Sequence, residues 1–419
     1  MRICFLQCQG HMFSGGQGVY GHYLTRELAR LGHEVHVIAG PPYQDVVPEV
    51  HLHRLKTSSF WGRLAGLLYG YDEYVRSHPL ELFHPVNFYE YTSTRFSAAA
   101  LLNMFSLRAR EKLNELERER PFDIVHDNQT LAYGVWLMTL RGRPVLATIH
   151  PPIEFDYEHE LLEARTFRRR LRLVVQYPWV MQRWVVPRLD RIIADSESSA
   201  AAVQQIYGLP QERVRVVPVG VDTDVFRPLE IERLPDGLLY VGHAEAATKG
   251  VRYLLEALRL LRDEVPFHLT VVQPPGSTKA RLLVDDLGLN GRVTFLELIS
   301  TDELVRQYNR ARVFVSPSLA EGFGLPAAEA MACATPVIAT TATSFPEVIE
   351  DGVSGVLVPP ADAGALARAI RALLGDPDRC RALGQAAHQR VVARFSWRRT
   401  AQETLAVYEE LASGQRARV

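Results

Sequence analysis

The stretch Ser316-Pro-Ser-Leu-Ala-Glu-Gly-Phe-Gly-Leu-Pro-Ala-Ala-Glu-Ala330 decides the fold of the second half of the chain. It has the pattern of a strand end, a tight turn and the start of a helix. Gly322 and Gly324 allow the turn, and Pro326 suits the first helical turn, where its missing N–H would be unpaired in any case. The stretch therefore predicts a strand–turn–helix unit of the kind found in α/β proteins.

This strand–turn–helix unit offers amides and carboxylates that can bind a ligand. The backbone amides that open the helix, those of Phe323, Gly324 and Leu325, are expected to face a ligand with the positive end of the helix dipole. Glu321 precedes the turn and Glu329 lies about two turns into the helix, so either carboxylate can bond ligand hydroxyls. The alternative is that both acids serve only as helix caps and solvated surface groups, which their apolar neighbours make awkward.

A second segment has a matching pattern, with Tyr240-Val-Gly242-His243 followed by Lys249-Gly250. A strand here ends in glycine, and a lysine sits at the start of the next helix. A cation in that position can meet a diphosphate and stabilise its charge. A solvated surface lysine is the alternative, but the position after the carboxyl end of a strand favours binding.

The same alternation runs outward through the whole chain and predicts parallel strands with crossover helices. A helix is expected at Val19–Leu31. Val219–Pro235 has linker composition between two α/β halves. The expected strands, by residue range, are Ile3–Cys8, Glu34–Ala39, Asp123–His126, Val145–Ile149, Arg191–Ala194, Val214–Val217, Leu238–Gly242, Phe267–Gln273, Val293–Leu296, Val313–Ser316 and Pro336–Ala339.

Length and composition limit the class of protein. The chain has 419 residues, which favours two domains. Its formal net charge of −1 gives no overall positive charge of the kind that favours nucleic-acid binding. Four scattered cysteines indicate a reducing cytoplasm. No segment reads as a signal peptide or a membrane span, so we expect a cytoplasmic protein, at most peripheral at the inner face of the membrane.

Gly16-Gln-Gly-Val-Tyr-Gly21 matches G-x-G-x-x-G literally. Residues 9–15 separate it from the first strand, and the second strand ends in Ala39-Gly-Pro-Pro without an acidic residue to hold a ribose. A dinucleotide-binding turn is therefore disfavoured. The loop is instead expected to approach a ligand closely, with a flexible connection as the alternative.

Two segments interrupt or decorate the α/β pattern. Ser58–Arg120 is rich in aromatic residues and is interpreted as helical insertions, either core aromatics beneath loops or an acceptor pocket or membrane-facing surface. Phe167–Trp184 mixes basic and aromatic residues. Residues 165–189 are a candidate for peripheral membrane contact, against the alternative of a helix packed on the first domain.

Taken in order, these motifs resemble the retaining glycosyltransferases of the GT-B fold, glycosyltransferase family 4, over nearly the whole length. The motifs that carry the resemblance are the glycine loop, Leu31-Gly-His-Glu-Val-His-Val, Asp123-Ile-Val-His126, Thr148-Ile-His150, Asp195-Ser-Glu, Pro218–Pro228, Gly242–Gly250 and Glu321 with seven residues before Glu329.

The resemblance implies a fold of two Rossmann-like domains with parallel sheets facing across a cleft. Residues 1–220 would form the acceptor-binding domain, joined by a C-terminal helix at 396–415 that crosses back. Residues 221–395 would form the nucleotide-sugar-binding domain.

The resemblance also implies roles for individual residues. His150, Lys249 and Glu321 would act in catalysis. The groups expected to bind the donor are Gly16, Gly242, His243, Lys249, Glu321, Phe323, Gly324, Leu325 and Glu329, with Glu321 on the sugar and Glu329 on the ribose. His126, Asp127 and His150 would lie on the acceptor side, and a satisfied core histidine is the alternative for His150.

The implied reaction is retaining transfer of a hexosyl unit from a nucleotide-diphosphate sugar to a glycan, lipid-linked or small-molecule hydroxyl. A donor phosphate oxygen would help to deprotonate the acceptor, and neither a metal nor a cofactor is expected. His243 stands where the family usually has arginine, which weakens the expected diphosphate clamp. Val219 stands where the family commonly has asparagine. The family also frequently has a glycine after the strand Val293–Leu296, where this chain reads Glu297-Leu-Ile299. Because that region often borders the nucleotide base in the family, the resemblance does not predict which base the donor carries.

Two other classes of protein stay open. One is a non-catalytic nucleotide-sugar-binding GT-B protein, for which His243 is the only support. The other is a GT-B phosphorylase or sugar-nucleotide epimerase.

Overall fold

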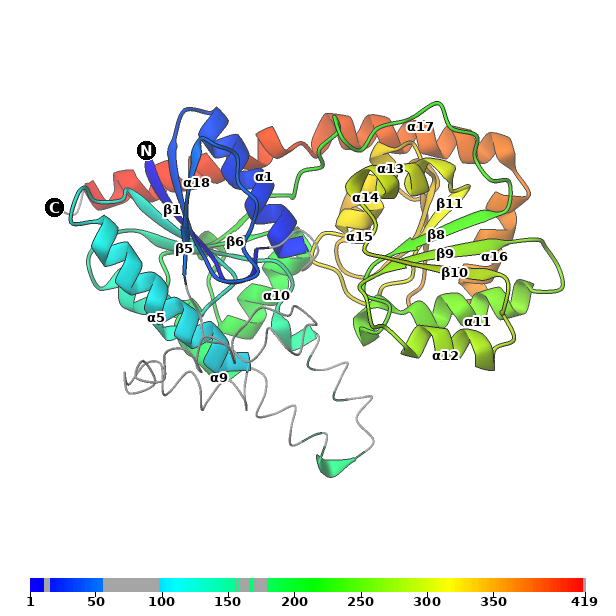
Figure 1. Ribbon diagram of the computed structural model, residues 1–419, viewed down its shortest axis with the longest axis horizontal. Coiled ribbons are helices and arrows are strands. Elements are labelled where there is room, and N and C mark those ends of the chain that lie inside the picture. The colour runs from blue at the N-terminus through cyan, green and yellow to red at the C-terminus, as the bar shows by residue number, and fades with distance from the viewer. Residues whose placement is uncertain are drawn as a thin grey trace, which may run out of the picture. The chain divides into compact units, whose positions relative to one another are not determined.

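The computed structural model describes residues 1–10, 16–55, 98–155, 157, 161, 166–168, 170 and 179–416. The chain forms two compact units. Unit 1 contains Met1–Asp195, Ala200–Val217 and Thr400–Val419, and unit 2 contains Ser196–Ser199 and Pro218–Arg399. Each unit is a parallel sheet flanked by helices (Figure 1).

The sheet of unit 1 has seven parallel strands in the order β3-β2-β1-β4-β5-β6-β7. Its central strands RICFLQ, IVHDN and VLATI are buried along their length, including the polar residues at their ends. The strands are β1 (Arg2–Gln7), β2 (Glu34–Ala39), β3 (Val50–Arg54), β4 (Ile124–Asn128), β5 (Val145–Ile149), β6 (Arg191–Ala194) and β7 (Val214–Val216).

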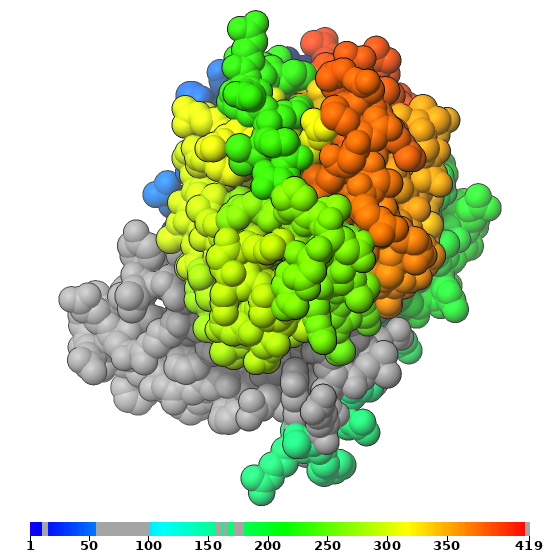
Figure 2. Space-filling model, turned by 90° about the vertical axis from the view of Figure 1, so that its right-hand side faces the viewer, coloured from blue at the N-terminus to red at the C-terminus, as the bar shows by residue number. Residues whose placement is uncertain are grey.

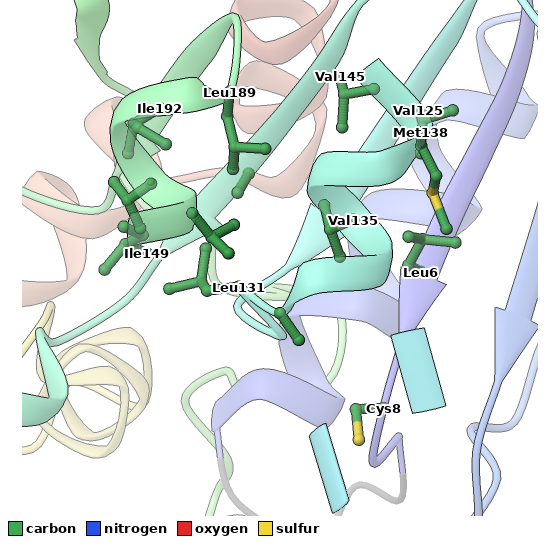
Figure 3. Close-up of a cluster of buried hydrophobic side chains, with 14 of the residues drawn as sticks. Leu6, Cys8, Val125, Leu131, Val135, Met138, Val145, Ile149, Leu189 and Ile192 are labelled. Carbon is green, nitrogen blue, oxygen red and sulfur yellow. The ribbon is translucent and has the colours of Figure 1, made fainter. Parts of the chain in front are cut away.

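Helices cover this sheet and close its core. They are α1 (Gly16–Arg30), α5 (Ala98–Leu116), α6 (Tyr133–Thr139), α9 (Trp179–Val185), α10 (Glu197–Tyr207) and α18 (Trp397–Arg416). Figure 3 shows Leu6 of β1 and Val125 of β4 beside Val135 and Met138 of α6, and all four side chains are completely buried. This packing fixes the strand ends that carry the polar groups described below.

Unit 2 repeats the scheme with six parallel strands in the order β10-β9-β8-β11-β12-β13. Its strands are β8 (Gly237–Val241), β9 (His268–Gln273), β10 (Val293–Glu297), β11 (Val313–Ser316), β12 (Val337–Thr340) and β13 (Val356–Val358). Its helices are α11 (Val251–Leu261), α12 (Lys279–Asp286), α13 (Thr301–Arg310), α14 (Leu325–Ala332), α15 (Phe345–Val348), α16 (Ala363–Leu374) and α17 (Pro377–Arg394).

Helix α11 shows why these segments are helical. Its buried residues recur at helical spacing, with Val251, Leu254, Leu255, Leu258 and Leu261 all facing the core. Helix α16 lies beside it. Figure 2 shows the face of unit 2 on which the orange segment containing α16 and α17 reaches the surface.

The predicted fold class is confirmed, since both halves form parallel α/β sheets. The predicted strands match within one or two residues, but two were missed. β3 reads Val-His-Leu-His-Arg at the edge of its sheet, and β13 has only three residues. β3 alternates apolar and polar residues and so has no apolar run, and the apolar run of β13 is only Val-Leu-Val.

The aromatic interval and the basic segment are described only in part. Residues 98–116 of the interval form α5, and residues 56–97 lie outside the described part of the chain. Within 165–189, residues 166–168, 170 and 179–189 are described. No helix in the described part of the chain has the length and apolar character needed to cross a bilayer.

Candidate active site

The strand order of unit 2 places its candidate site. β8 lies between β9 and β11. From β8 the chain continues through β9 to β10 at one edge of the sheet, and from β11 it continues through β12 to β13 at the other edge. Ligands of open α/β sheets bind where the order reverses in this way, outside the carboxyl ends of the strands. The loop with Gly242 and Lys249 follows β8, and the loop with Glu321 follows β11.

The backbone locks these two loops together. Gly250 has a φ of 61°, and a β-carbon there would lie 2.1 Å from the carbonyl oxygen of Pro317. The amide of Leu319 donates to the carbonyl of Thr248 at 2.6 Å. The turn before Gly250 (Ala247–Lys249) is therefore held directly against the segment that leads to Glu321.

Lys249 and Glu321 form an ion pair, with Nζ 2.7 Å from Oε1. The hydroxyl of Ser318 donates to the same carboxylate oxygen at 2.9 Å. The two charged side chains keep 30% and 13% of their surface exposed, so solvent and a ligand both have access. The structure thus brings together the cation and the carboxylate that the sequence placed 72 positions apart.

Thr343 fixes the backbone of Glu321, a role that the sequence analysis missed. Its hydroxyl accepts from the amide of Glu321 at 2.8 Å and donates to the carbonyl of the same residue at 2.8 Å. Its φ is +47°, in the left-handed region that a β-branched residue rarely occupies. The sequence around Thr343 gives no signal of this role, because both the hydrogen bonds and the backbone strain arise only in the folded chain.

Helix α14 begins as the sequence predicts. Gly324 precedes it with a φ of 91°, and a β-carbon there would lie 2.6 Å from the ring of Phe345. Among the described residues, no acceptor pairs with the amides of Phe323, Gly324 and Leu325. Three N–H groups at a helix N-terminus suit an anion.

Glu329 differs in setting from Glu321. It is buried, and the hydroxyl of Tyr308 donates to its Oε2 at 2.8 Å. Burial raises the pKa of this carboxyl to about 7, and the bond from Tyr308 opposes part of that rise. A bond from Glu329 to a ribose stays a prediction.

Gly242 and His243 follow β8. Gly242 has a φ of 152° and donates its amide to the carbonyl of Val272 at 3.0 Å. His243 is exposed, which leaves its ring open to a ligand.

Unit 1 has an equivalent edge. β1 lies between β2 and β4, so the strand order reverses there too. His150, just after β5, is buried and bonds through Nδ1 to Asp195 Oδ2 at 2.6 Å and through Nε2 to Asn128 Oδ1 at 2.8 Å. Asn128 ends β4 and Asp195 follows β6. Sequence reasoning found His150 but missed Asn128 and gave Asp195 no chemical role.

The other residues predicted for the acceptor side are enclosed. His126 bonds Thr148 at 2.7 Å and Tyr408 of α18 at 2.5 Å, and burial lowers the pKa of its ring to about 3. Asp127 accepts from the amide of Leu131 at 2.8 Å, and burial raises the pKa of its carboxyl to about 6. In this structure neither side chain offers an atom to a ligand, so the geometry does not support their predicted contact with an acceptor.

Gly16 is the first residue of α1, and residues 11–15 of the glycine loop lie outside the described residues. Its predicted approach to a ligand therefore stays a prediction. Within the described ranges, no group of three or more His, Cys, Asp or Glu side chains is placed to hold a metal ion.

Two parallel α/β units with polar groups at the reversal points of their sheets define the class, a glycosyltransferase with the GT-B fold. Residues 14–225 match the family described as Glycosyltransferase Family 4, and residues 223–390 match Glycosyl transferases group 1. The chain belongs to glycosyltransferase family 4.

Relatives in sequence support this assignment over the full length. The chain is 36% identical to the MMP alpha-(1->4)-mannosyltransferase of Mycolicibacterium hassiacum over 98% of both chains. It is 35% identical to the D-inositol 3-phosphate glycosyltransferase of Mycolicibacterium smegmatis over 97% of this chain and 88% of that one.

Solved structures share the fold. Sucrose-phosphate synthase from Thermosynechococcus elongatus aligns with a TM-score of 0.74 at 23% identity, covering 99% of this chain and all of that one. Anabaena HepE, solved with UDP and glucose, aligns with a TM-score of 0.66 at 18% identity, covering 98% and 100%.

Proposed function

We propose that this protein is a retaining, metal-independent mannosyltransferase that moves a mannosyl unit from a nucleotide-diphosphate mannose to a sugar hydroxyl. The observation that carries the proposal is the Lys249–Glu321 pair, 2.7 Å apart, at the reversal point of the second sheet. The unpaired amides at the start of α14 add donors for an anion. The mannosyl donor and an α-(1→4) product are taken from the relative that is 36% identical over 98% of both chains.

In the proposed reaction the bond from the sugar C1 to the diphosphate oxygen breaks, and a bond from C1 to the acceptor oxygen forms on the same face. The acceptor proton passes to a phosphate oxygen of the donor. Lys249 and the amides of Gly324 and Leu325 would stabilise the charge that develops on the leaving diphosphate. Glu321 would bond hydroxyls of the transferred sugar and hold it in place.

The test begins with the donor. A thermal-shift screen against GDP-, UDP- and ADP-sugars identifies the donor that raises the melting temperature, because a ligand of the native state stabilises it. Product formation on α-mannosides then tests transfer, and NMR of the product tests retention. Inositol 3-phosphate belongs in the same screen because several relatives carry that acceptor in their names.

Glu321→Ala is expected to abolish transfer while the fold persists. Lys249 is partly exposed, so it can be solvated when its partner is removed. The matched control is Glu256→Ala, which removes a partly exposed carboxylate paired with Arg252 on α11. If Glu321→Ala turns over like the wild type, or if no nucleotide sugar is bound or consumed, the proposal fails.

Two further features belong to the proposal. Transfer is expected to persist in the presence of EDTA. The protein is expected to act in the cytoplasm, where its four free, buried cysteines would stay reduced. Contact with the inner face of the membrane through 165–189 is supported by the exposed side chains of Phe167, Arg168 and Arg170.

A further inference from the structure

Side chains from four strand ends of unit 1 form one connected polar chain around His150. Gln7 ends β1, Asn128 ends β4, His150 follows β5 and Asp195 follows β6. Asn128 Nδ2 lies 2.7 Å from Gln7 Oε1, and His150 Nε2 lies 2.8 Å from Asn128 Oδ1. Because every member is buried, the direction of each hydrogen bond follows from the groups at the ends of the chain.

Backbone carbonyls fix the orientation of both amides. Gln7 Nε2 donates to the carbonyl of Gln9 at 2.5 Å, so Gln7 Oε1 must be the atom that faces Asn128. Asn128 Nδ2 also donates to the carbonyl of Gln17 at 3.0 Å. If either amide were flipped, its oxygen would face the backbone carbonyl oxygen to which its nitrogen now donates, and neither oxygen could donate a hydrogen bond. Asn128 therefore presents its oxygen to His150.

His150 then has an acceptor at each ring nitrogen. Nε2 faces Asn128 Oδ1, and Nδ1 faces Asp195 Oδ2 at 2.6 Å. A neutral imidazole has one N–H donor and one lone pair and cannot satisfy both contacts. The His150–Asp195 pair therefore holds two protons, one on Nε2 and one between Nδ1 and the carboxylate. An imidazole is more basic than a carboxylate, so the second proton resides on the ring.

The burial of Asp195 leads to the same result. The carboxylate is almost completely enclosed, and its Oδ1 has no hydrogen-bond partner among the described residues. A buried carboxylate beside a neutral ring would lack a countercharge, which is costly. A charged His150 supplies that countercharge at 2.6 Å.

We propose that Asp195 and Asn128 hold His150 as an imidazolium, so that it brings a positive charge and no proton-accepting lone pair to the reaction. The role rests on the transfer reaction proposed above and deepens it. His150 cannot serve there as the base for the acceptor hydroxyl, which leaves the donor phosphate oxygen to take that proton. Asp195 and Asn128 are positioning residues that act through His150.

Besides Asp195, the titratable side chains of Tyr20 and His126 lie near His150 in the described part of the chain. The Tyr20 ring packs edge-on against it at 4.8 Å between centroids, and burial holds the pKa of the Tyr20 hydroxyl well above its usual range. His126 lies beyond Thr148, and burial together with the charge of His150 lowers the pKa of its ring. Both groups are neutral at neutral pH, so Asp195 is the charged partner among the side chains named here.

The test is a long-range ¹H–¹⁵N spectrum of the full chain labelled with ¹⁵N-histidine, recorded without substrate from about pH 6 to about pH 8. The His150 signals are assigned by their loss in His150→Gln. Both ring nitrogens are expected to show the protonated signature throughout. In Asp195→Asn one nitrogen is expected to become unprotonated near neutral pH, and Asp195→Glu should restore the wild-type pattern.

Kinetics give a second readout that a purely structural role would not move. Loss of the countercharge in Asp195→Asn should shift the fall of kcat/KM at alkaline pH to lower pH, with Asp195→Glu near the wild type. A wild-type spectrum with one unprotonated His150 nitrogen at neutral pH overturns the proposal even if transfer is confirmed. Absence of transfer with the protonated signature intact refutes the proposed function instead.

Discussion

Thr343 offers the sharpest test of how the structure holds Glu321. Its hydroxyl makes two hydrogen bonds of 2.8 Å to the backbone of Glu321, and its φ of +47° is unfavourable for a β-branched residue. The stabilising hydrogen bonds come from the hydroxyl, and the destabilising backbone strain comes from the β-carbon. Substitutions can therefore remove the hydrogen bonds and keep the strain, or remove both.

The magnitudes follow from this separation. Thr343→Val keeps the shape and the strain but loses both bonds, which costs about 2 kcal/mol at roughly 1 kcal/mol per bond. Thr343→Gly loses the same bonds but relieves about 1–2 kcal/mol of left-handed strain. Part of that relief is offset by the greater freedom of glycine in the unfolded chain, so the net loss is about 1 kcal/mol. Thr343→Ser keeps the hydroxyl and should resemble the wild type.

The assay is thermal unfolding of the full chain, read alongside the rate of sugar transfer. For a unit of this size about 2–4 °C corresponds to 1 kcal/mol, so the valine variant should melt about 4–8 °C lower and the glycine variant about 2–4 °C lower. Transfer should fall in both variants, because both lose the two hydrogen bonds from Thr343 that hold the backbone of Glu321, and should persist in the serine variant. A glycine variant that is no more stable than the valine variant would refute the assignment of strain to Thr343.

Three further predictions test other parts of the structure. Burial raises the pKa of Glu329 to about 7 from 4.5, so the folded state binds the extra proton, and stability falls as pH rises from about 4.5 to about 7. Glu329→Gln should gain about 2.5 kcal/mol relative to the wild type as the pH of urea unfolding rises from about 5 to about 8, and a stability difference between the two proteins that does not change with pH would contradict the burial argument. Gly250→Ala should destabilise by at least about 2 kcal/mol more than Gly291→Ala, because both positions have positive φ but only the first lacks space for a β-carbon; equal losses would show that the loops can separate. Arg168→Glu with Arg170→Glu should reduce co-sedimentation with anionic liposomes, and unchanged sedimentation would remove the membrane proposal.

The sequence determined the local structure. Alternating apolar runs and amphipathic segments predicted most of the strands, because a strand buried on both faces has to be apolar along its length. Gly324 and Pro326 predicted the start of α14, since their backbone restrictions act within a few residues. The same local signals placed Lys249, Glu321 and His150 after strand ends.

Only the tertiary structure decided which strand ends meet. The order that sets β8 beside β11 joins Lys249 to Glu321, and the order that sets β4, β5 and β6 side by side joins His150 to Asp195. These neighbours depend on how the whole sheet assembles, so no local pattern contains them. The burial of Glu329, the strain at Thr343 and the two acceptors around His150 arise in the same way, because the cost of enclosing a charge or straining a backbone exists only where the rest of the fold surrounds it.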